Sequence, residues 1–222
     1  ESLCAAGNYT DAAEVYESLG DSAKVTECIY AYAGQLREQG EYLLAARQYE
    51  AIMDYADSHD QHYQMGLQAR DNDKLADAYA IFIADPDYRD TQEAIYQTGV
   101  SASAEELYEV SVAAFTQVGA YKDAAMKLTM DTYAWGEQLY DNGEYDRSAE
   151  VFDSMGEFSD AAARANEARY AAATEQLKDG NYADAKERFA ALGDYKDSAT
   201  MIRECDYQSA SAIYRNANYA AA

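Results

Sequence analysis

The sequence repeats itself, and this periodicity constrains the fold more than any other feature of the chain. A first column of large residues recurs every 33 residues and then every 37: Tyr9, Tyr42, Leu75, Tyr108, Tyr145, Tyr182 and Tyr219. A second column of aromatic residues follows seven positions later: Tyr16, Tyr49, Phe82, Phe115, Phe152 and Phe189. Periods of about 20 to 50 residues are typical of arrays in which each unit buries its apolar face against the next.

Two further columns share the same periods. The third lies six residues after the second: Ser22, Tyr55, Tyr88, Tyr121, Phe158 and Tyr195. The fourth consists of tyrosine alone, and a Gly or Ala follows each member three residues later: Tyr30, Tyr63, Tyr96, Tyr133, Tyr170 and Tyr207. Four coincident columns over six units argue strongly against chance.

Each unit is predicted to contain two helices. Between Tyr133 and Tyr140 apolar and small residues recur at intervals of three and four, and Gly143 then ends this first helix, which we call helix A. A second, shorter helix follows from Tyr145 and ends at Gly156; we call it helix B. With one Pro and 12 Gly in 222 residues, the composition also favours helix. The sequence predicts an all-α solenoid of antiparallel helix-turn-helix repeats.

A recurring Asp-Tyr-x-Asp element precedes helix A, as in Asp54-Tyr55-Ala56-Asp57 and Asp194-Tyr195-Lys196-Asp197. An aspartate at the N-cap accepts a hydrogen bond from a free backbone N–H, and carboxylates near a helix start favour the positive end of its dipole. We expect each such cap to contribute about 1 kcal/mol.

These patterns resemble the tetratricopeptide repeat family, in particular divergent bacterial members. Two units carry the small residue, Gly, Tyr, Ala and aromatic of that motif: Ala33, Gly40, Tyr42, Ala45 and Tyr49, then Ala173, Gly180, Tyr182, Ala185 and Phe189. The resemblance covers almost the whole chain. It departs where a Gly-Asp-Tyr turn replaces the family's Pro, and where Asn72-Asp73-Lys74-Leu75 replaces Gly and Tyr. The resemblance implies a scaffold whose helices A line a concave groove.

The repeat length changes after about residue 121, from 33 to 37 residues. The four added residues lie between the third and fourth columns and correspond to about 6 Å of helix. We therefore expect helix A to be longer at its N-terminal end in the later units, without a break within 125–132.

Residues 1–222 are expected to form a single solenoid, and both ends lie within a unit. Residues Glu1 to Ala6 match the tail of a helix A, and Asn218-Tyr219-Ala220 match the start of a helix B. This pattern indicates an excerpt from a longer array.

The formal net charge of −24 limits the choice of partner. Like charges repel, so a nucleic-acid backbone or an anionic membrane surface is a poor direct partner. No apolar run is long enough to insert into a membrane. The sequence predicts a neutral or basic protein or peptide as partner, and it leaves the compartment open.

Catalytic and metal-binding patterns are scarce. Ser159, Asp160 and Ser198 fall in turns that precede helices, and His59 and His62 are the only histidines. These two histidines do not supply the ligand set of a metal site. Glycines occur singly, so there is no phosphate-binding loop. We expect no catalytic residues, no metal and no cofactor.

Four aromatic residues lie outside the columns and on predicted helices A: Tyr32, Trp135, Tyr140 and Tyr214. Aromatic anchors often dominate interface energies, so these residues are the predicted binding site. The same residues could instead fill gaps in the core. The leading hypothesis is a non-catalytic protein or peptide scaffold. The alternatives are a glycan or small-ligand binding module of the cell envelope, with aromatic rings stacked on sugars, and a passive spacer between domains.

Overall fold

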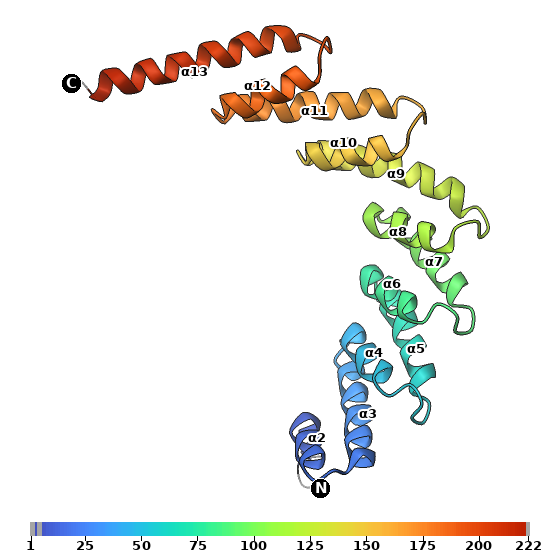
Figure 1. Ribbon diagram of the computed structural model, residues 1–222. Helices are drawn as coiled ribbons and strands as arrows, with labels where there is room; N and C mark the ends of the chain where they lie inside the picture. The colour runs from blue at the N-terminus through green and yellow to red at the C-terminus, as the bar shows by residue number, and fades with distance from the viewer. Residues whose placement is uncertain (1–2, 4–5, 221–222) are drawn as a thin grey trace. The chain divides into compact units, whose positions relative to one another are not determined.

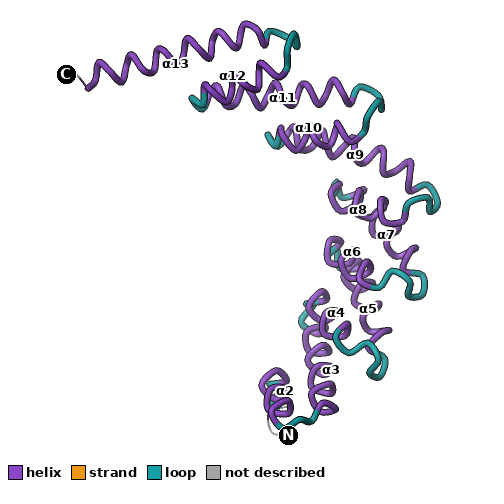
Figure 2. The backbone as a smooth tube through the Cα atoms, in the orientation of Figure 1, coloured by secondary structure: helices purple, strands orange, loops and turns teal. Residues whose placement is uncertain are grey.

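The protein is all-α in the part that the computed structural model describes, residue 3 and residues 6–220. These residues form twelve helices and no strand (Figure 1, Figure 2). The helices are α2 (Tyr9–Ser18), α3 (Ser22–Glu38), α4 (Tyr42–Glu50), α5 (Ser58–Asp71), α6 (Leu75–Ala84), α7 (Thr91–Ala104), α8 (Tyr108–Val118), α9 (Ala124–Asp141), α10 (Tyr145–Ser154), α11 (Ala161–Lys178), α12 (Tyr182–Ala191) and α13 (Ser198–Ala220). The odd-numbered helices from α3 onwards are helices A, and the even-numbered ones are helices B.

Helices that follow one another in the sequence pack side by side, as the repeat predicts. Helix A packs on the helix B of its own repeat, as α7 does on α8, and helix B packs on the next helix A, as α4 does on α5 and α10 on α11. Alternate helices also touch, as α4 does with α6. The helical repeat fold predicted from the sequence is thereby confirmed.

The contacts group the chain into two compact units. Unit 1 comprises Glu1–Leu128, and unit 2 comprises Thr129–Ala222, with the boundary inside α9. This boundary lies close to residue 121, where the repeat length changes.

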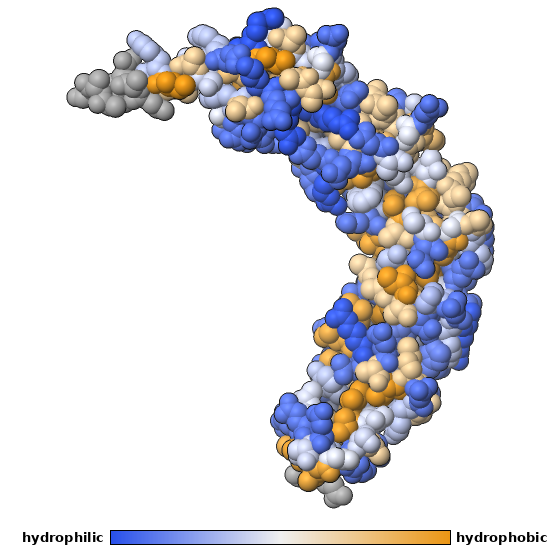
Figure 3. Space-filling model, in the orientation of Figure 1, coloured by the Kyte–Doolittle hydropathy of each residue, from blue (hydrophilic) through white to orange (hydrophobic). Residues whose placement is uncertain are grey.

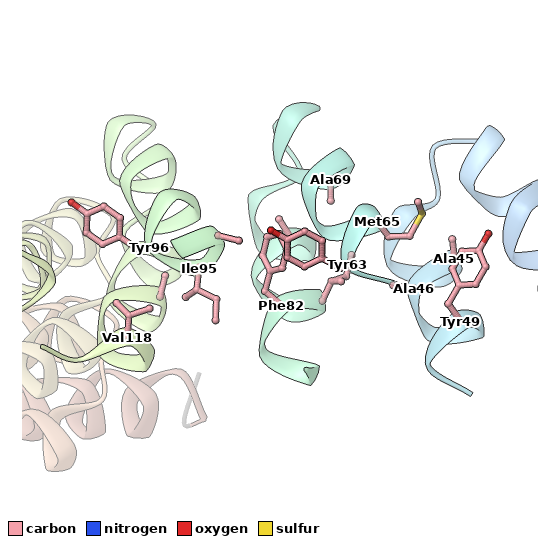
Figure 4. Packing of buried hydrophobic residues seen from close by; sticks show 14 of the residues in the cluster. Ala45, Ala46, Tyr49, Tyr63, Met65, Ala69, Phe82, Ile95, Tyr96 and Val118 are labelled. Atoms are coloured by element: carbon pink, nitrogen blue, oxygen red, sulfur yellow. The ribbon is translucent and has the colours of Figure 1, made fainter. Parts of the chain in front are cut away.

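The second column forms the core of both units. From Tyr49 to Phe189 its five aromatic side chains are at most 1% exposed. In unit 1, Tyr63 lies against Phe82 with ring centroids 5.7 Å apart, and Figure 4 shows the two rings together between α5 and α6. Hydrophilic residues cover much of the visible surface (Figure 3).

The small residue after each fourth-column tyrosine allows close helix packing. A Cβ atom built on Gly66 would lie 2.5 Å from the ring of Phe82, and one on Gly136 would lie 2.7 Å from the ring of Phe152. Real Cβ atoms do not approach other atoms this closely, so these rings occupy the space that glycine leaves. The small-residue column therefore sets the distance between helices A and B.

The fourth-column tyrosines join each repeat to the next one, within unit 1 and within unit 2. Each hydroxyl donates a hydrogen bond to the aspartate 27 residues later, in the turn before the next helix A. The pairs are Tyr30–Asp57, Tyr63–Asp90, Tyr96–Asp123, Tyr133–Asp160 and Tyr170–Asp197. In the first three the two oxygens are 2.5 Å apart.

The capping role expected for these aspartates is wrong at three of them. Asp57, Asp90 and Asp160 occupy N-cap positions, but their side chains accept no capping hydrogen bond from a backbone N–H of the helix they precede. Instead, each carboxylate accepts a hydrogen bond from the tyrosine hydroxyl of the previous helix A. Asp21 does cap its helix, since it accepts a hydrogen bond of 3.1 Å from the Lys24 N–H.

The greater length expected for helix A in the later units holds relative to α5 and α7, but α3, an early helix A, already has 17 residues. α5 and α7 have 14 residues, whereas α9 and α11 have 18. The added residues lie at the N-terminal end, and α9 runs unbroken from Ala124 to Asp141. A four-residue insertion returns every side chain to nearly the same helix face, so the buried stripe is kept.

The expected start of a helix B at Asn218-Tyr219-Ala220 is wrong, because these residues belong to α13. α9 and α11 are followed by Gly143 and Gly180, whose φ angles are 81° and 82°. The corresponding position near the end of α13 holds Ala217, which continues a helix more readily than glycine. The expected helix tail at Glu1 to Ala6 lies mostly outside the described residues.

The link between Tyr96 and Asp123 makes stability depend on pH at both extremes. The hydrogen bond raises the pKa of Tyr96 to about 12, from an ordinary value near 10, and lowers the pKa of Asp123. The tyrosine contribution is therefore complete below about pH 10 and lost as pH rises towards 12. The aspartate contribution is present above about pH 4 and lost as pH falls through its lowered pKa.

We expect the stability advantage of wild type over Tyr96→Phe to be largest between about pH 5 and pH 9 and to shrink on both sides. Urea unfolding followed by circular dichroism at a series of pH values measures this difference. An advantage that stays constant from about pH 3 to pH 12 would contradict the linkage between the two groups.

Candidate functional site

Three adjoining hollows on the surface of unit 2 form the candidate site. Their volumes are about 540, 240 and 340 Å³. The first and second share Gln176 and Arg188, and the second and third share Tyr145 and Glu175, so together they make one continuous surface. The lining residues are Tyr140, Gly143, Glu144, Tyr145, Asp146, Arg147, Glu167, Tyr170, Ala171, Ala172, Thr174, Glu175, Gln176, Lys178, Asp179, Asp184, Glu187, Arg188 and Ala191. We call this surface the unit-2 groove.

The groove is built by helices of both types. α10 and α12 contribute residues of helix B, α11 contributes most of the floor, and α9 contributes Tyr140 near its C-terminal end. The family resemblance implied a surface made by helices A. In unit 2, the starts of helices B are part of it as well.

Acidic side chains outnumber basic ones in the groove. The lining contains seven Asp or Glu and three Lys or Arg residues. Two of the three cations are already paired within the protein: Arg188 binds both carboxylate oxygens of Asp146 at 2.6 and 3.0 Å, and Arg147 binds Glu144 at 2.6 Å. The groove therefore presents an excess of negative charge to a partner.

The ion pair between Arg188 and Asp146 spans two helices B. The hydrogen bonds from the guanidinium lower the pKa of Asp146, and this carboxylate in turn raises the pKa of Arg188. A bidentate pair fixes the direction of both side chains. Asp146 is largely exposed and Arg188 is partly exposed, so the pair orders the groove wall and adds little stability.

Two tyrosines form an aromatic edge of the groove. The rings of Tyr140 and Tyr145 pack edge to face, with centroids 5.2 Å apart. The Arg164 guanidinium lies 5.2 Å from the Tyr140 ring centroid and is itself held by Glu137 through a hydrogen bond of 2.5 Å. Burial raises the pKa of Tyr140, so its hydroxyl remains neutral. These contacts hold the aromatic edge in place before any partner arrives.

The structure places one of the four predicted site residues in the groove lining and a second one next to it. Tyr140 lines the groove, and Trp135 lies beside it, with the Arg147 guanidinium 5.9 Å from its ring centroid. Tyr32 belongs to unit 1, where it is partly buried and packed against the core. Tyr214 lies on α13 and is 70% exposed, outside the linings of the three hollows.

Sequence reasoning missed Tyr145 and the pair of Arg188 with Asp146. Tyr145 belongs to the first column, which was attributed to packing, but it is only half-buried because it begins helix B, where the neighbouring helices no longer cover it. That position at a helix start was a usable signal. The ion pair joins residues 42 positions apart and leaves no local signature.

The histidines lie in the packing of unit 1. His59 contacts the carboxylate of Asp85 at 2.5 Å and stacks on Tyr88 with centroids 3.8 Å apart. His62 is buried, and this burial lowers its pKa. Among the described residues, no group of three or more His, Cys, Asp or Glu residues could hold a metal ion. None of the described helices is long and apolar enough to cross a membrane.

No protein-family model, curated protein or solved structure matches this chain. A function must therefore be inferred from the geometry and charge of the groove.

Proposed function

We propose that this protein is a non-catalytic docking scaffold, similar to tetratricopeptide proteins, whose unit-2 groove binds a basic segment of a protein partner. The observation that carries the proposal is the acidic excess of the groove beside the fixed Tyr140–Tyr145 edge. Side chains that are already fixed lower the ordering cost of binding, and the aromatic edge is fixed in this way.

The chemistry of the groove favours lysine and arginine side chains. No ion pair is recorded for Glu175, Asp179, Asp184 or Glu187 in the described part of the chain, so these carboxylates remain available for basic groups. The alkyl stems of lysine and arginine can pack on the tyrosine rings while their charged heads reach the carboxylates. The net charge of −24 adds long-range attraction, which accelerates the encounter.

The position of Trp135 supports peptide docking over glycan binding. A sugar would have to stack on an accessible ring face, and Arg147 already lies over the ring of Trp135. Charged side chains also line all three hollows, whereas stacking sites for sugars depend on open aromatic faces.

A blocked heptapeptide of alternating Gly and Lys tests the proposal when it is titrated calorimetrically against the whole chain. The matched neutral probe has Gln in place of Lys. We expect the Lys peptide to bind and the Gln peptide not to bind. Because exposed charges are screened by salt, affinity should fall from low to moderate ionic strength.

Variants locate the binding surface. Tyr145→Ala combined with Glu175→Lys should weaken binding about tenfold or more, because the pair removes an aromatic contact and reverses a charge. The matched control is Tyr182→Ala with Glu150→Lys, which makes the same changes on unit 2 outside the groove lining. Equal weakening by both pairs would reduce the interaction to general charge attraction and would count against the groove.

A further inference from the structure

An aromatic-x-Asp element precedes each of α5, α7, α9, α11 and α13, and in three of these five elements a cation lies between two tyrosines. The variable residue x is Arg89, Lys122 or Lys196 in these elements, and its φ angle is 48° or 49°. The Lys122 ammonium lies 4.8 Å from the ring centroid of Tyr96 and 5.2 Å from that of Tyr121. Lys196 and Arg89 lie over the equivalent ring pairs at 4.9 to 5.8 Å.

The same cations pair with a carboxylate three residues before the fourth-column tyrosine. Lys122 binds Glu93 at 2.5 and 2.6 Å, and the Tyr121 hydroxyl donates to the same carboxylate at 2.6 Å. These hydrogen bonds lower the pKa of Glu93 to about 2. Lys196 and Tyr195 hold Glu167 in the same way, and Arg89 lies 2.7 Å from Asp60. Two rings and one carboxylate thus form a recurring clamp around a basic side chain.

The remaining two elements lack a basic residue at x, and they differ from one another. In one of them x is Ser159, and Met130 stands where the clamp carboxylate would be, so cation and carboxylate are both missing. In the other x is Ala56, yet Glu27 occupies the carboxylate position. Among the five elements, only this one has the carboxylate and no basic residue at x.

The rings of the Ala56 element are arranged as in the filled clamps. The centroids of Tyr30 and Tyr55 are 5.6 Å apart with an edge-to-face angle of 69°, close to the 5.7 Å and 72° of Tyr96 and Tyr121. Tyr30 also keeps its hydrogen bond of 2.5 Å to Asp57. The aromatic part of the clamp is therefore formed without a cation.

The acidic part is accessible from solvent. The Glu27 side chain is 48% exposed, and it forms an ion pair of 2.5 Å with the 46% exposed Lys24, three residues earlier in the same helix. Such exposed pairs contribute little and exchange readily with other partners. In the described structure the Tyr55 hydroxyl has no recorded hydrogen bond, unlike its counterparts Tyr121 and Tyr195.

We propose that Glu27, Tyr30 and Tyr55 form a slot for one lysine or arginine side chain of a protein partner. The three filled clamps show that this combination of groups holds a cation. The methyl group of Ala56 is too short to reach the position that the cation occupies in those clamps. The inference rests on the proposed function in one respect, the basic character of the partner. The slot belongs to unit 1 and the groove to unit 2, so either can fail without the other.

The blocked tripeptide Ac-Gly-Lys-Gly-NH2 tests the slot by titration against the whole chain, followed by backbone amide NMR shifts. The neutral probe has norleucine in place of lysine. We expect the lysine peptide to shift amides of residues 24–30 and 54–58, and the norleucine peptide to leave them unchanged. If the lysine peptide instead shifted amides over the whole acidic surface, with no concentration at these residues, the proposal would be overturned.

Ala56→Lys supplies the cation from the protein itself and should weaken tripeptide binding about tenfold, as should Glu27→Gln. Ala56→Lys should fold, because Lys122 and Lys196 adopt the same backbone conformation. Ser159→Lys is the matched control and should not change binding, since it adds the same residue where the carboxylate is replaced by Met130. Unchanged affinity in Ala56→Lys would overturn the slot. If groove variants still abolish heptapeptide binding in that case, the proposed function stands without the slot.

Discussion

Replacing Phe82 with alanine is expected to lower the free energy of unfolding of unit 1 by about 3 to 5 kcal/mol. The side chain is 1% exposed and packs between α5 and α6 against Tyr63. Truncation removes the burial of the whole ring and leaves a cavity that the close helix packing can only partly fill. Urea unfolding followed by helical circular dichroism, with hydrogen exchange to localise the loss, measures the effect.

The neighbouring residue Ile83 provides the control. It is 39% exposed, so Ile83→Ala removes a comparable apolar group from a position that water already reaches. We expect this variant to lose about 1 kcal/mol or less. Similar losses from both variants would mean that the second column does not form the core.

The second large effect is that replacing two different glycines with alanine should change the stability of unit 1 in opposite directions. Both Gly34 and Gly66 lie within helices A, where alanine is intrinsically favoured by about 1 kcal/mol. A Cβ on Gly34 would meet nothing within 4 Å, whereas a Cβ on Gly66 would lie 2.5 Å from the Phe82 ring. We expect Gly34→Ala to stabilise unit 1 and Gly66→Ala to destabilise it by about 1 to 3 kcal/mol.

A double variant isolates the contact with the ring. In the Phe82→Ala background the ring is gone, so Gly66→Ala should become neutral or stabilising. The coupling between the two positions should therefore be large, and thermal or urea unfolding of the four proteins measures it. Additive losses would show that Gly66 is required for a reason other than its approach to Phe82.

The repeat columns predicted the helices, their lengths and their order, because periodicity reports which face of a helix is buried. Periodicity does not report depth. All four columns are mainly aromatic, yet Phe115 of the second is fully buried, whereas Phe158 of the third is 42% exposed. Depth depends on neighbouring helices that a single period does not contain.

Long-range partners explain the other differences between expectation and structure. Asp57 has the sequence context of an N-cap, and a hydroxyl 27 residues earlier takes its carboxylate. Tyr140 could be singled out because it lies outside the columns, but Arg188 and Asp146 meet only after two hairpins have stacked. The aromatic part of the candidate site could thus be predicted in part, while its ion-pair wall could not.

The constant spacing of the tyrosine–aspartate link has a consequence for how such a chain can grow. The link spans 27 residues in units of both lengths, because the four added residues lie after the aspartate and before the next tyrosine. The hydrogen bond that joins two repeats therefore does not depend on the length of the helix A that follows it. Segments of one repeat that begin just after the aspartate have equivalent ends, whether they are short or long. Such segments can be duplicated, deleted or exchanged without a change in the tyrosine–aspartate spacing.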